Sequence, residues 1–470
     1  MSDQIELNPL HLSHKIGKLV PRWRRFASSG GASTRNESPF LGEFPGLSAF
    51  RQVQDLPEHD PLRLPLLRWV HRLTDARIHI PWAHHDAELS YRQKHALVLP
   101  FETSLSLSEI RKNGVSSTFE RSSSSRKRTL LSSEGERAQW WMALEGCEAE
   151  LSAHRIERWA RYHEVSTRLG VSSQDEMWSP LGKPQGEEVE QGFFLDRLAE
   201  QANVVLELTD DAAQAHFKRG WASLAEALSA HEAPEGWPAR LALDSLRELW
   251  GMSDLFRGLD LSLSLPPLPA RLCPQSFPRA AATMGRALCV ALIPHDVPFV
   301  RGRDPDDLLG HEIAELFHRW SCSPVFQARK LGLSQRTLEE YRRHWALAQL
   351  ASLRLAAARL LIMRGALTGT RVLERVFEET TRRLLGRSLP LSSALARFEI
   401  RHDEPARFVA FFSAARRETE LRNSYDEDWY ESPRAQEQLR AEISLPASRE
   451  RNLDNLRVCT TEILERLALG

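Results

Sequence analysis

The sequence has little cysteine and no excess of charge of either sign. Its five cysteines lie far apart along 470 residues with no C-x-x-C pair, so neither a disulfide framework nor a cysteine zinc site is expected. The 62 Lys and Arg residues balance 63 Asp and Glu residues, for a net charge of −1. This balance argues against a chain-wide surface for nucleic acid or anionic membrane. The cysteine usage suits a reducing compartment, and we expect a cytoplasmic protein.

Long apolar runs and nucleotide-binding motifs are also missing. The longest apolar stretch, residues 355–363, contains Arg359 and is too short to cross a membrane. The first segment, MSDQIELNPL, lacks the basic and apolar regions of a secretion signal. There is no G-x-x-x-x-G-K-[ST] loop, no G-x-G-x-x-G after a strand and no G-x-S-x-G elbow. We therefore expect no membrane partner and no nucleotide-dependent chemistry.

Apolar residues recur with helical spacing from residue 138 onward, which predicts a mainly α fold. A chain of this length corresponds to about three domains. Two polar stretches, 28–45 and 115–136, are predicted to be loops or linkers. A helix is expected from about Pro65. The exception to helix is the short, apolar, partly β-branched run 286–293, which is predicted to be a strand.

The segment DPDDLLGHEIAELFH, residues 304–318, combines a strong helix start with ionisable side chains on one face. Asp304 fits the N-cap and Pro305 the first helical position. Helical spacing gives one apolar stripe: Leu309, Ile313, Leu316 and Trp320. The opposite face and its flank carry ionisable groups: His311, Glu312, Glu315 and His318. Ligands four residues apart can hold one ion, and a Glu beside the first His can activate metal-bound water. The alternative is a polar face that meets water.

A second helix is predicted from the cap Ser334 to Gly365. On this helix Glu340 and His344 lie four residues apart on one face. Two antiparallel helices that each offer a His and a Glu could converge on one ion. The candidate metal ligands are therefore four residues: His311, Glu315, Glu340 and His344.

With these motifs in view, the chain resembles the gluzincin metallopeptidases of the thimet oligopeptidase and oligoendopeptidase F type over residues 265–445. The signature of that family is H-E-x-x-H-x-x-H, followed by a glutamate ligand 29 residues after the first His. GHEIAELFH places His311, Glu312 and His318 at the matching positions. Glu340 lies 340 − 311 = 29 residues after the first of them.

The resemblance implies a large helical zincin-like scaffold with a small β element beside the H-E-x-x-E helix. It implies that Glu312 is the general base, that His402 stabilises the transition state and that an edge strand at 287–293 binds the substrate backbone. The chain would then contain three parts: an N-terminal region with flexible linkers (1–133), a helical domain that forms a cleft wall (134–264) and the metallopeptidase-like domain (265–470).

Two departures from the family pattern imply weaker chemistry. Glu315 replaces the second zinc-binding His, which keeps a potential ligand but adds negative charge and favours a harder ion such as manganese or iron over zinc. His344 is the alternative source of the missing imidazole. Where the family carries tyrosine hydroxyls for the oxyanion, this chain has phenylalanines and only two later tyrosines: Phe408, Phe411, Phe412, Tyr425 and Tyr430.

The leading hypothesis is a metallopeptidase-like protein with reduced or lost activity, with or without a divalent metal, that binds a peptide or protein in a helical cleft. One alternative is an active metal-dependent oligopeptidase. Another is a helical scaffold in a multiprotein assembly, without a metal site, whose His and Glu side chains are solvated or ion-paired. A nucleic-acid-associated factor that uses the basic cluster Arg126–Arg128 is the weakest hypothesis, because the chain as a whole carries no basic excess.

Overall fold

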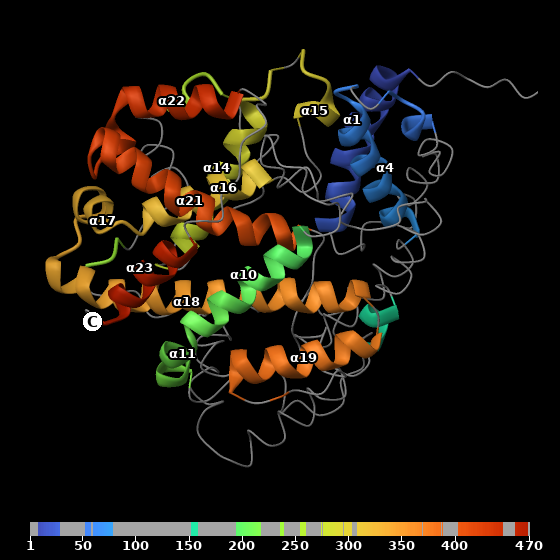
Figure 1. Cartoon of the computed structure of the whole chain (residues 1–470). Helices are drawn as coiled ribbons and strands as arrows, with labels where there is room; N and C mark the ends of the chain where they lie inside the picture. Colours follow the sequence, from blue (N-terminus) through green and yellow to red (C-terminus); the bar gives the residue numbers. More distant parts are fainter. Residues whose placement is uncertain are drawn as a thin grey trace, which may run out of the picture.

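The computed structural model describes a helical protein (Figure 1). The described residues are 8–28, 52–57, 60–78, 152–157, 194–217, 236–238, 254–259, 274, 276–294, 296–302, 308–368, 370–386, 388, 403–444 and 456–468. Every regular element in these ranges is a helix, which confirms the mainly α prediction. The predicted linkers, apart from Ser28 at the end of the first helix, lie outside them, as do the basic cluster Arg126–Arg128 and the cap pair Asp304 and Pro305.

Three helices form a group near the N-terminal end of the described chain. Helix α1 (Pro9–Ser28) packs on α4 (Arg63–Ile78), and both contact the one-turn helix α15 (Phe299–Gly302). The ring of Trp69 lies 5.5 Å from that of Phe299, measured between centroids. Helix α4 confirms the helix expected from about Pro65. Aromatic packing therefore joins segments that are far apart in the sequence.

The larger apolar core surrounds α18, the longest of the described helices, and includes residues of several others. The elements of this core are α10 (Phe194–Leu208), α11 (Asp210–His216), α18 (Gln335–Thr368), α19 (Thr370–Leu385), α21 (Glu404–Tyr425) and α23 (Leu456–Ala468). Two of them, α10 and α11, come from the predicted cleft-wall region. That region thus shares its core with the C-terminal part, and the boundary at residue 264 stays a prediction.

A second core is rich in aromatic side chains. Its helices are α14 (Ser276–Ala291), α16 (Leu308–Ser321), α17 (Pro324–Leu331) and α22 (Pro433–Ser444), with the short 3-10 helices η2 (Asp254–Phe256) and η4 (Trp429–Glu431). Parts of α18 and α21 also contribute to it. The ring of Trp320 lies 4.8 Å from Phe326 and 5.5 Å from Tyr430. At Gly285 a Cβ atom would meet the carbonyl oxygen of Ile313 at 2.8 Å, so α14 and α16 pack with their backbones in close approach.

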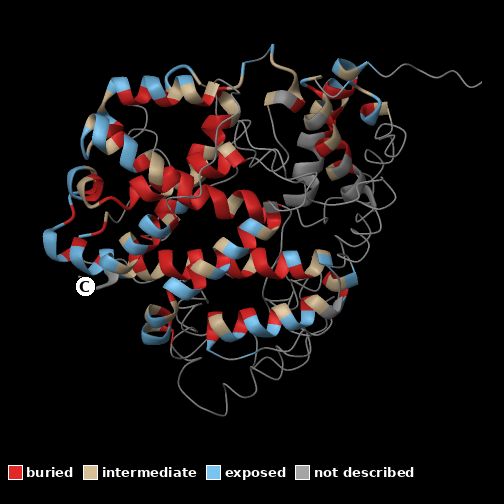
Figure 2. Ribbon diagram, viewed as in Figure 1, coloured by how far each residue is buried: buried red, intermediate tan, exposed pale blue. Residues whose placement is uncertain are grey.

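Helix α16 is buried on both of its faces. It packs between α14 and α21, and Figure 2 shows red, buried ribbon through this central part of the molecule. Ile313 and Leu316 are fully buried on the apolar stripe, and His311 and Glu312 are buried on the other side. The alternative of a polar face that meets water therefore does not hold at His311 and Glu312. Because buried charges must be paired, their partners decide what this helix can do.

Helix α18 begins where the sequence predicts and ends later. The hydroxyl of Ser334 accepts the backbone N–H of Thr337 at 3.2 Å, as an N-cap residue does. The helix continues past Gly365 because that glycine serves a close packing contact: a Cβ there would lie 3.2 Å from Cα of Leu373. By length and composition α18 could cross a membrane, but 72% of its most apolar window is buried inside the protein, as in a core helix.

The strand predicted at 286–293 is wrong, because residues up to Ala291 continue α14. A short apolar run does not by itself separate a buried strand from a buried helix. The buried positions Phe277, Met284 and Leu288 lie seven and four residues apart, which is helical spacing. The edge strand that the resemblance implies at 287–293 is therefore helical through Ala291, and no β element occurs in the described ranges.

Candidate functional site

His311 is bonded to a carboxylate at the start of α21. Its Nε2 lies 2.9 Å from Oδ2 of Asp403, and both side chains are buried. Arg407, one turn into α21, donates its Nε to the same oxygen at 3.0 Å. Asp403 sits at the N-cap of α21 but makes no side-chain cap hydrogen bond. Its carboxylate therefore binds His311 and Arg407, and its other oxygen, Oδ1, is buried without a hydrogen-bond partner.

The His311 and Asp403 pair consists of a neutral imidazole and an ionised carboxylate. Burial lowers the pKa of His311, although the hydrogen bond to Asp403 acts in the opposite direction. Burial acts to raise the pKa of Asp403, but the bond from His311 and the charge of Arg407 hold it well below its usual range. A carboxylate can only accept, so the imidazole proton is on Nε2. Nε2 cannot bind a metal ion while it carries a proton, and the lone pair available to an ion is on the other ring nitrogen, Nδ1.

Glu312 is bonded to an arginine of α21. The Nε of Arg417 donates to Oε1 of Glu312 at 2.6 Å, and both side chains are largely buried. The same guanidinium also bonds Glu442 of α22. Burial acts to lower the pKa of Arg417, but the two carboxylates raise it, so the cation is retained. Through Arg417, the carboxylates of Glu312 and Glu442 link three helices: α16, α21 and α22. One of the two oxygens that a general base would use is therefore bonded to a buried arginine.

Arg319 is the most deeply buried cation of α16, with 2% of its side chain exposed. Its Nε donates to Glu418 of α21 at 2.7 Å and its Nη2 donates to Glu462 of α23 at 3.1 Å. Arg422 donates to the other oxygen of Glu418 at 2.6 Å. Burial acts to lower the pKa of Arg319, but the surrounding carboxylates raise it above its ordinary value. This network therefore ties α16, α21 and α23 together by charge.

The ionisable side chains of α16 form a polar row: His311, Glu312, Glu315, His318 and Arg319. Glu315 and His318 are its most exposed members. Gln349 of α18 places its Nε2 3.5 Å from Oε1 of Glu315 and 3.4 Å from Nδ1 of His318. Oε1 of Glu315 lies 3.9 Å from Nδ1 of His318, and the two side chains are 21% and 27% exposed, respectively. Burial raises the pKa of Glu315 to about 7, against the charge of Arg319. Burial also lowers the pKa of His318 to about 4. Glu315 is therefore the carboxylate of this row that titrates near neutral pH.

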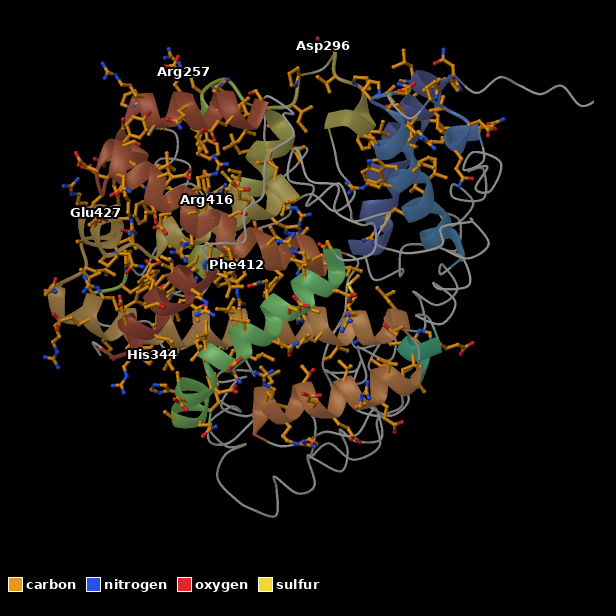
Figure 3. All side chains as sticks on the ribbon, in the orientation of Figure 1. Arg257, Asp296, His344, Phe412, Arg416 and Glu427 are labelled. Carbon is orange, nitrogen blue, oxygen red and sulfur yellow. The ribbon has the colours of Figure 1, made fainter. Side chains whose placement is uncertain are left out.

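Glu340 lies away from the predicted ligands on α16. Glu340 is exposed, and it precedes Gln349, the α18 residue that contacts Glu315, by nine positions. At 1.5 Å per residue this is about 13 Å along the helix. His344 is half-buried, and Figure 3 shows it toward the lower left, apart from Phe412 near the centre of α21. The structure does not bring Glu340 to the hydrogen-bonded pairs of α16.

The described donors do not fit a bound metal ion. In the part of the chain that the structure describes, no three His, Cys, Asp or Glu side chains form a group that could hold one. The protonated Nε2 of His311 faces Asp403, and Glu312 faces Arg417. His402 lies outside the described residues, so its role stays a prediction.

The aromatic residues near the C-terminal end do not surround this polar row with hydroxyls. The phenylalanines of α21 are core residues: Phe408, Phe411 and Phe412. Tyr425 ends α21, at the opposite end from Asp403, and its hydroxyl donates to Gln438 at 2.6 Å. The ring of Tyr430 lies in the second core beside Trp320. The predicted lack of oxyanion donors is consistent with these positions.

Sequence reasoning missed the partners that define the site: Asp403, Arg417, Arg319 and Glu418. A signal existed for Asp403, because an Asp shortly before Pro405 repeats the helix-start pattern of Asp304 and Pro305. Arg417 and Glu418 closely follow the apolar segment FVAFFSAA in the same helix, so a packed helix would require buried partners for them. No sequence pattern pairs them with α16, because the pairing depends on how the two helices pack.

No model of a known protein family matches the chain, and no curated protein matches it. The interpretation of the site therefore depends on its own geometry.

Proposed function

We propose that this is a non-catalytic, metallopeptidase-like protein that binds a peptide or protein partner. In this proposal the H-E-x-x-E residues hold the helical body together. The observation that carries it is the pairing of His311 with Asp403 and of Glu312 with Arg417, both in buried surroundings. Metallopeptidase chemistry would require Glu312 to be released from Arg417, whereas the bond of His311 to Asp403 occupies only one of its two ring nitrogens.

The energetics of the two pairs support this proposal. Removing one partner from a buried ion pair such as Glu312 and Arg417 costs about 3–5 kcal/mol, because the other charge is left without compensation. The bond of the neutral His311 to the Asp403 carboxylate contributes less, about 1.5–3 kcal/mol. An ion at Nε2 of His311 would have to displace the proton and separate the imidazole from Asp403. An ion at Nδ1 could keep that bond, but in the described residues no group of three His, Cys, Asp or Glu side chains is present to hold it. A water activated by Glu312 would compete with Arg417 for the carboxylate. General-base chemistry at Glu312 would therefore begin by breaking a contact that stabilises the fold.

The sequence spacing supports a zincin-like origin for the scaffold. His311, Glu312 and Glu340 match the gluzincin signature, while Glu315 replaces the second imidazole. The exposed position of Glu340 and the core positions of the phenylalanines favour loss of activity over altered metal choice. A helical interaction protein also agrees with the balanced charge and with the cytoplasmic location that we expect.

The test is elemental analysis of the purified full chain for zinc, manganese and iron, together with a peptide-hydrolysis assay. We expect less than one metal per chain and no hydrolysis that depends on Glu312. Glu420→Gln is the matched control for Glu312→Gln, because Glu420 lies on α21 with 64% of its side chain exposed. The proposal would be overturned by one bound metal that is lost in His311→Ala, with hydrolysis that is lost in Glu312→Gln and kept in Glu420→Gln.

A further inference from the structure

The last helix of the chain, α23, lies within the helical body. It packs on α18, α10 and α21, and Figure 1 shows it between α21 and α18, beside α10. Its apolar residues belong to the same core as those of α18 and α10. We call the faces of α10, α18 and α21 under this helix, together with Arg319 of α16, the α23 seat.

Four side chains anchor α23 in the seat. Leu456, Cys459, Thr460 and Ile463 are each almost completely buried. They occupy positions i, i+3, i+4 and i+7, which is the spacing with which an amphipathic helix lies in a groove. Val458, on the outer face, is 66% exposed. The helix thus presents one narrow row of small and apolar groups to the body and turns its other face outward.

The seat also carries a cation that faces the helix. Arg319 is buried, and its Nη2 donates to Glu462 of α23 at 3.1 Å. Burial raises the pKa of the Cys459 thiol to about 11, so this anchor is a neutral side chain close to the guanidinium. Glu418 of the body balances part of the charge of Arg319. A helix in the seat therefore gains from a carboxylate at position i+6 as well as from its apolar row.

Building on the binding function proposed above, we propose that the α23 seat is the partner site. Its ligand is an amphipathic helical peptide with small or apolar residues at i, i+3, i+4 and i+7 and a carboxylate at i+6. Helix α23 is the occupant supplied by the chain itself. Because α23 is tethered to the body, it competes at a high effective concentration, and a partner must displace it. The seat is thus a regulated site that the protein's own last helix covers.

The experiment uses the full chain and a fluorescent peptide with the sequence of residues 452–470, followed by fluorescence anisotropy. The double variant Cys459→Asp, Ile463→Asp loosens α23 in the full chain without touching the seat. Val458→Asp is the matched control on the exposed face. We expect the labelled peptide to bind the double variant at least about tenfold more tightly than the parent or the control, which corresponds to about 1.4 kcal/mol.

The ligand pattern is tested in the peptide itself. A peptide with Ile463→Asp should lose binding to the double variant, and one with Glu462→Gln should bind it several-fold more weakly. Equal binding of the parent peptide to all three proteins, or full binding of the Ile463→Asp peptide, would overturn the proposal. A parent chain that dimerises by exchanging α23, and that the peptide converts to monomers, would assign the seat to a second copy instead and also contradict it.

A second variant tests the proposal if the double variant does not fold. Full-chain Glu462→Gln is the milder substitution, since it weakens only the bond to Arg319, and a several-fold gain in peptide affinity is expected there. Unchanged affinity in Glu462→Gln, with the α16 amides still protected from hydrogen exchange, would count against the proposal. Metal content and hydrolysis do not enter these measurements, so a failure of the non-catalytic assignment would be seen separately.

Discussion

Helices α16 and α18 both bury charged side chains, and they stabilise them differently. The charges of Glu312 and Arg319 on α16 meet opposite charges from other helices: Arg417, Glu418 and Glu462. The neutral His311 donates to the carboxylate of Asp403. On α18 the fully buried Arg354 meets mainly dipoles. It donates to the carbonyl of Leu206 at 2.9 Å, to the carbonyl of Arg383 at 2.6 Å and to the hydroxyl of Thr209 at 2.6 Å.

The difference shows which part of the molecule depends on pairing. Arg354 sits near the C-terminal end of α10, where unpaired carbonyls attract a cation. Its one carboxylate partner, Asp210, has 34% of its side chain exposed and can return to water. Arg417 and Glu418, the partners of Glu312 and Arg319, are more deeply buried, with 12% and 4% of their side chains exposed. Removing either partner therefore leaves a buried charge without full compensation. The candidate site is therefore the region where single substitutions should be most damaging.

The largest effect is expected for Arg319→Met. This substitution leaves the buried Glu418 with Arg422 alone and removes the bond to Glu462. We expect the free energy of unfolding to fall by about 3–5 kcal/mol, measured by denaturant titration of the full chain. A loss below about 1 kcal/mol would mean that the network of α16 contributes little to the fold.

A smaller loss is expected for Arg354→Met, because the groups left behind are carbonyls, a hydroxyl and a partly exposed carboxylate. We expect about 2–3 kcal/mol in the same titration. Burial lowers the pKa of Arg354, which agrees with a cation that is less well compensated than Arg319. If Arg354→Met proved more damaging than Arg319→Met, the ranking of the two helices would be reversed.

The smallest effects concern the pH dependence of Glu315 and His318. The pKa of Glu315 is about 7 in the folded chain against an ordinary value of 4.5, so its contribution to stability falls as pH rises from 4.5 to 7. The pKa of His318 is about 4 against 6.5, so its contribution falls as pH drops from 6.5 to 4. The two trends oppose each other in the parent chain.

Each substitution should reveal the trend of the remaining group. With His318→Gln, stability should rise by about 1–2 kcal/mol relative to the parent as pH falls from neutral to about 4.5. With Glu315→Gln, stability relative to the parent should fall by a similar amount over the same range. Denaturant titrations at several pH values measure both differences, and the titration of all other groups cancels. Identical profiles for the two variants would contradict the assigned shifts.

The sequence predicted the helical class, the helix that contains H-E-x-x-E and the cap of α18 at Ser334. It failed where tertiary packing decides the outcome. The apolar run 286–293 is compatible with strand or helix. In the structure, the helix that begins at Ser276 continues through this run to Ala291. The sequence predicts a helix end at Gly365. In the structure this residue lies within α18, where the absence of a side chain allows close packing against α19.

The candidate site was predictable only in part. The position of His311 and Glu312 on one helix follows from spacing, but their partners lie about ninety or more residues away, at Asp403 and Arg417. The spacing to Glu340 agrees with the family signature, yet that residue is exposed on α18. Spacing along the chain cannot report on partners that a packed second helix supplies.

The pair of Glu312 and Arg417 tests the central claim most directly. A double-mutant cycle compares the unfolding free energies of the parent, Glu312→Gln, Arg417→Met and the double variant. If the pair is structural, each single variant is destabilised and the double variant loses less than their sum, with a coupling energy of about 2 kcal/mol. A coupling energy near zero, with Glu312→Gln as stable as the parent, would contradict the account and return Glu312 to the list of free, potentially catalytic carboxylates.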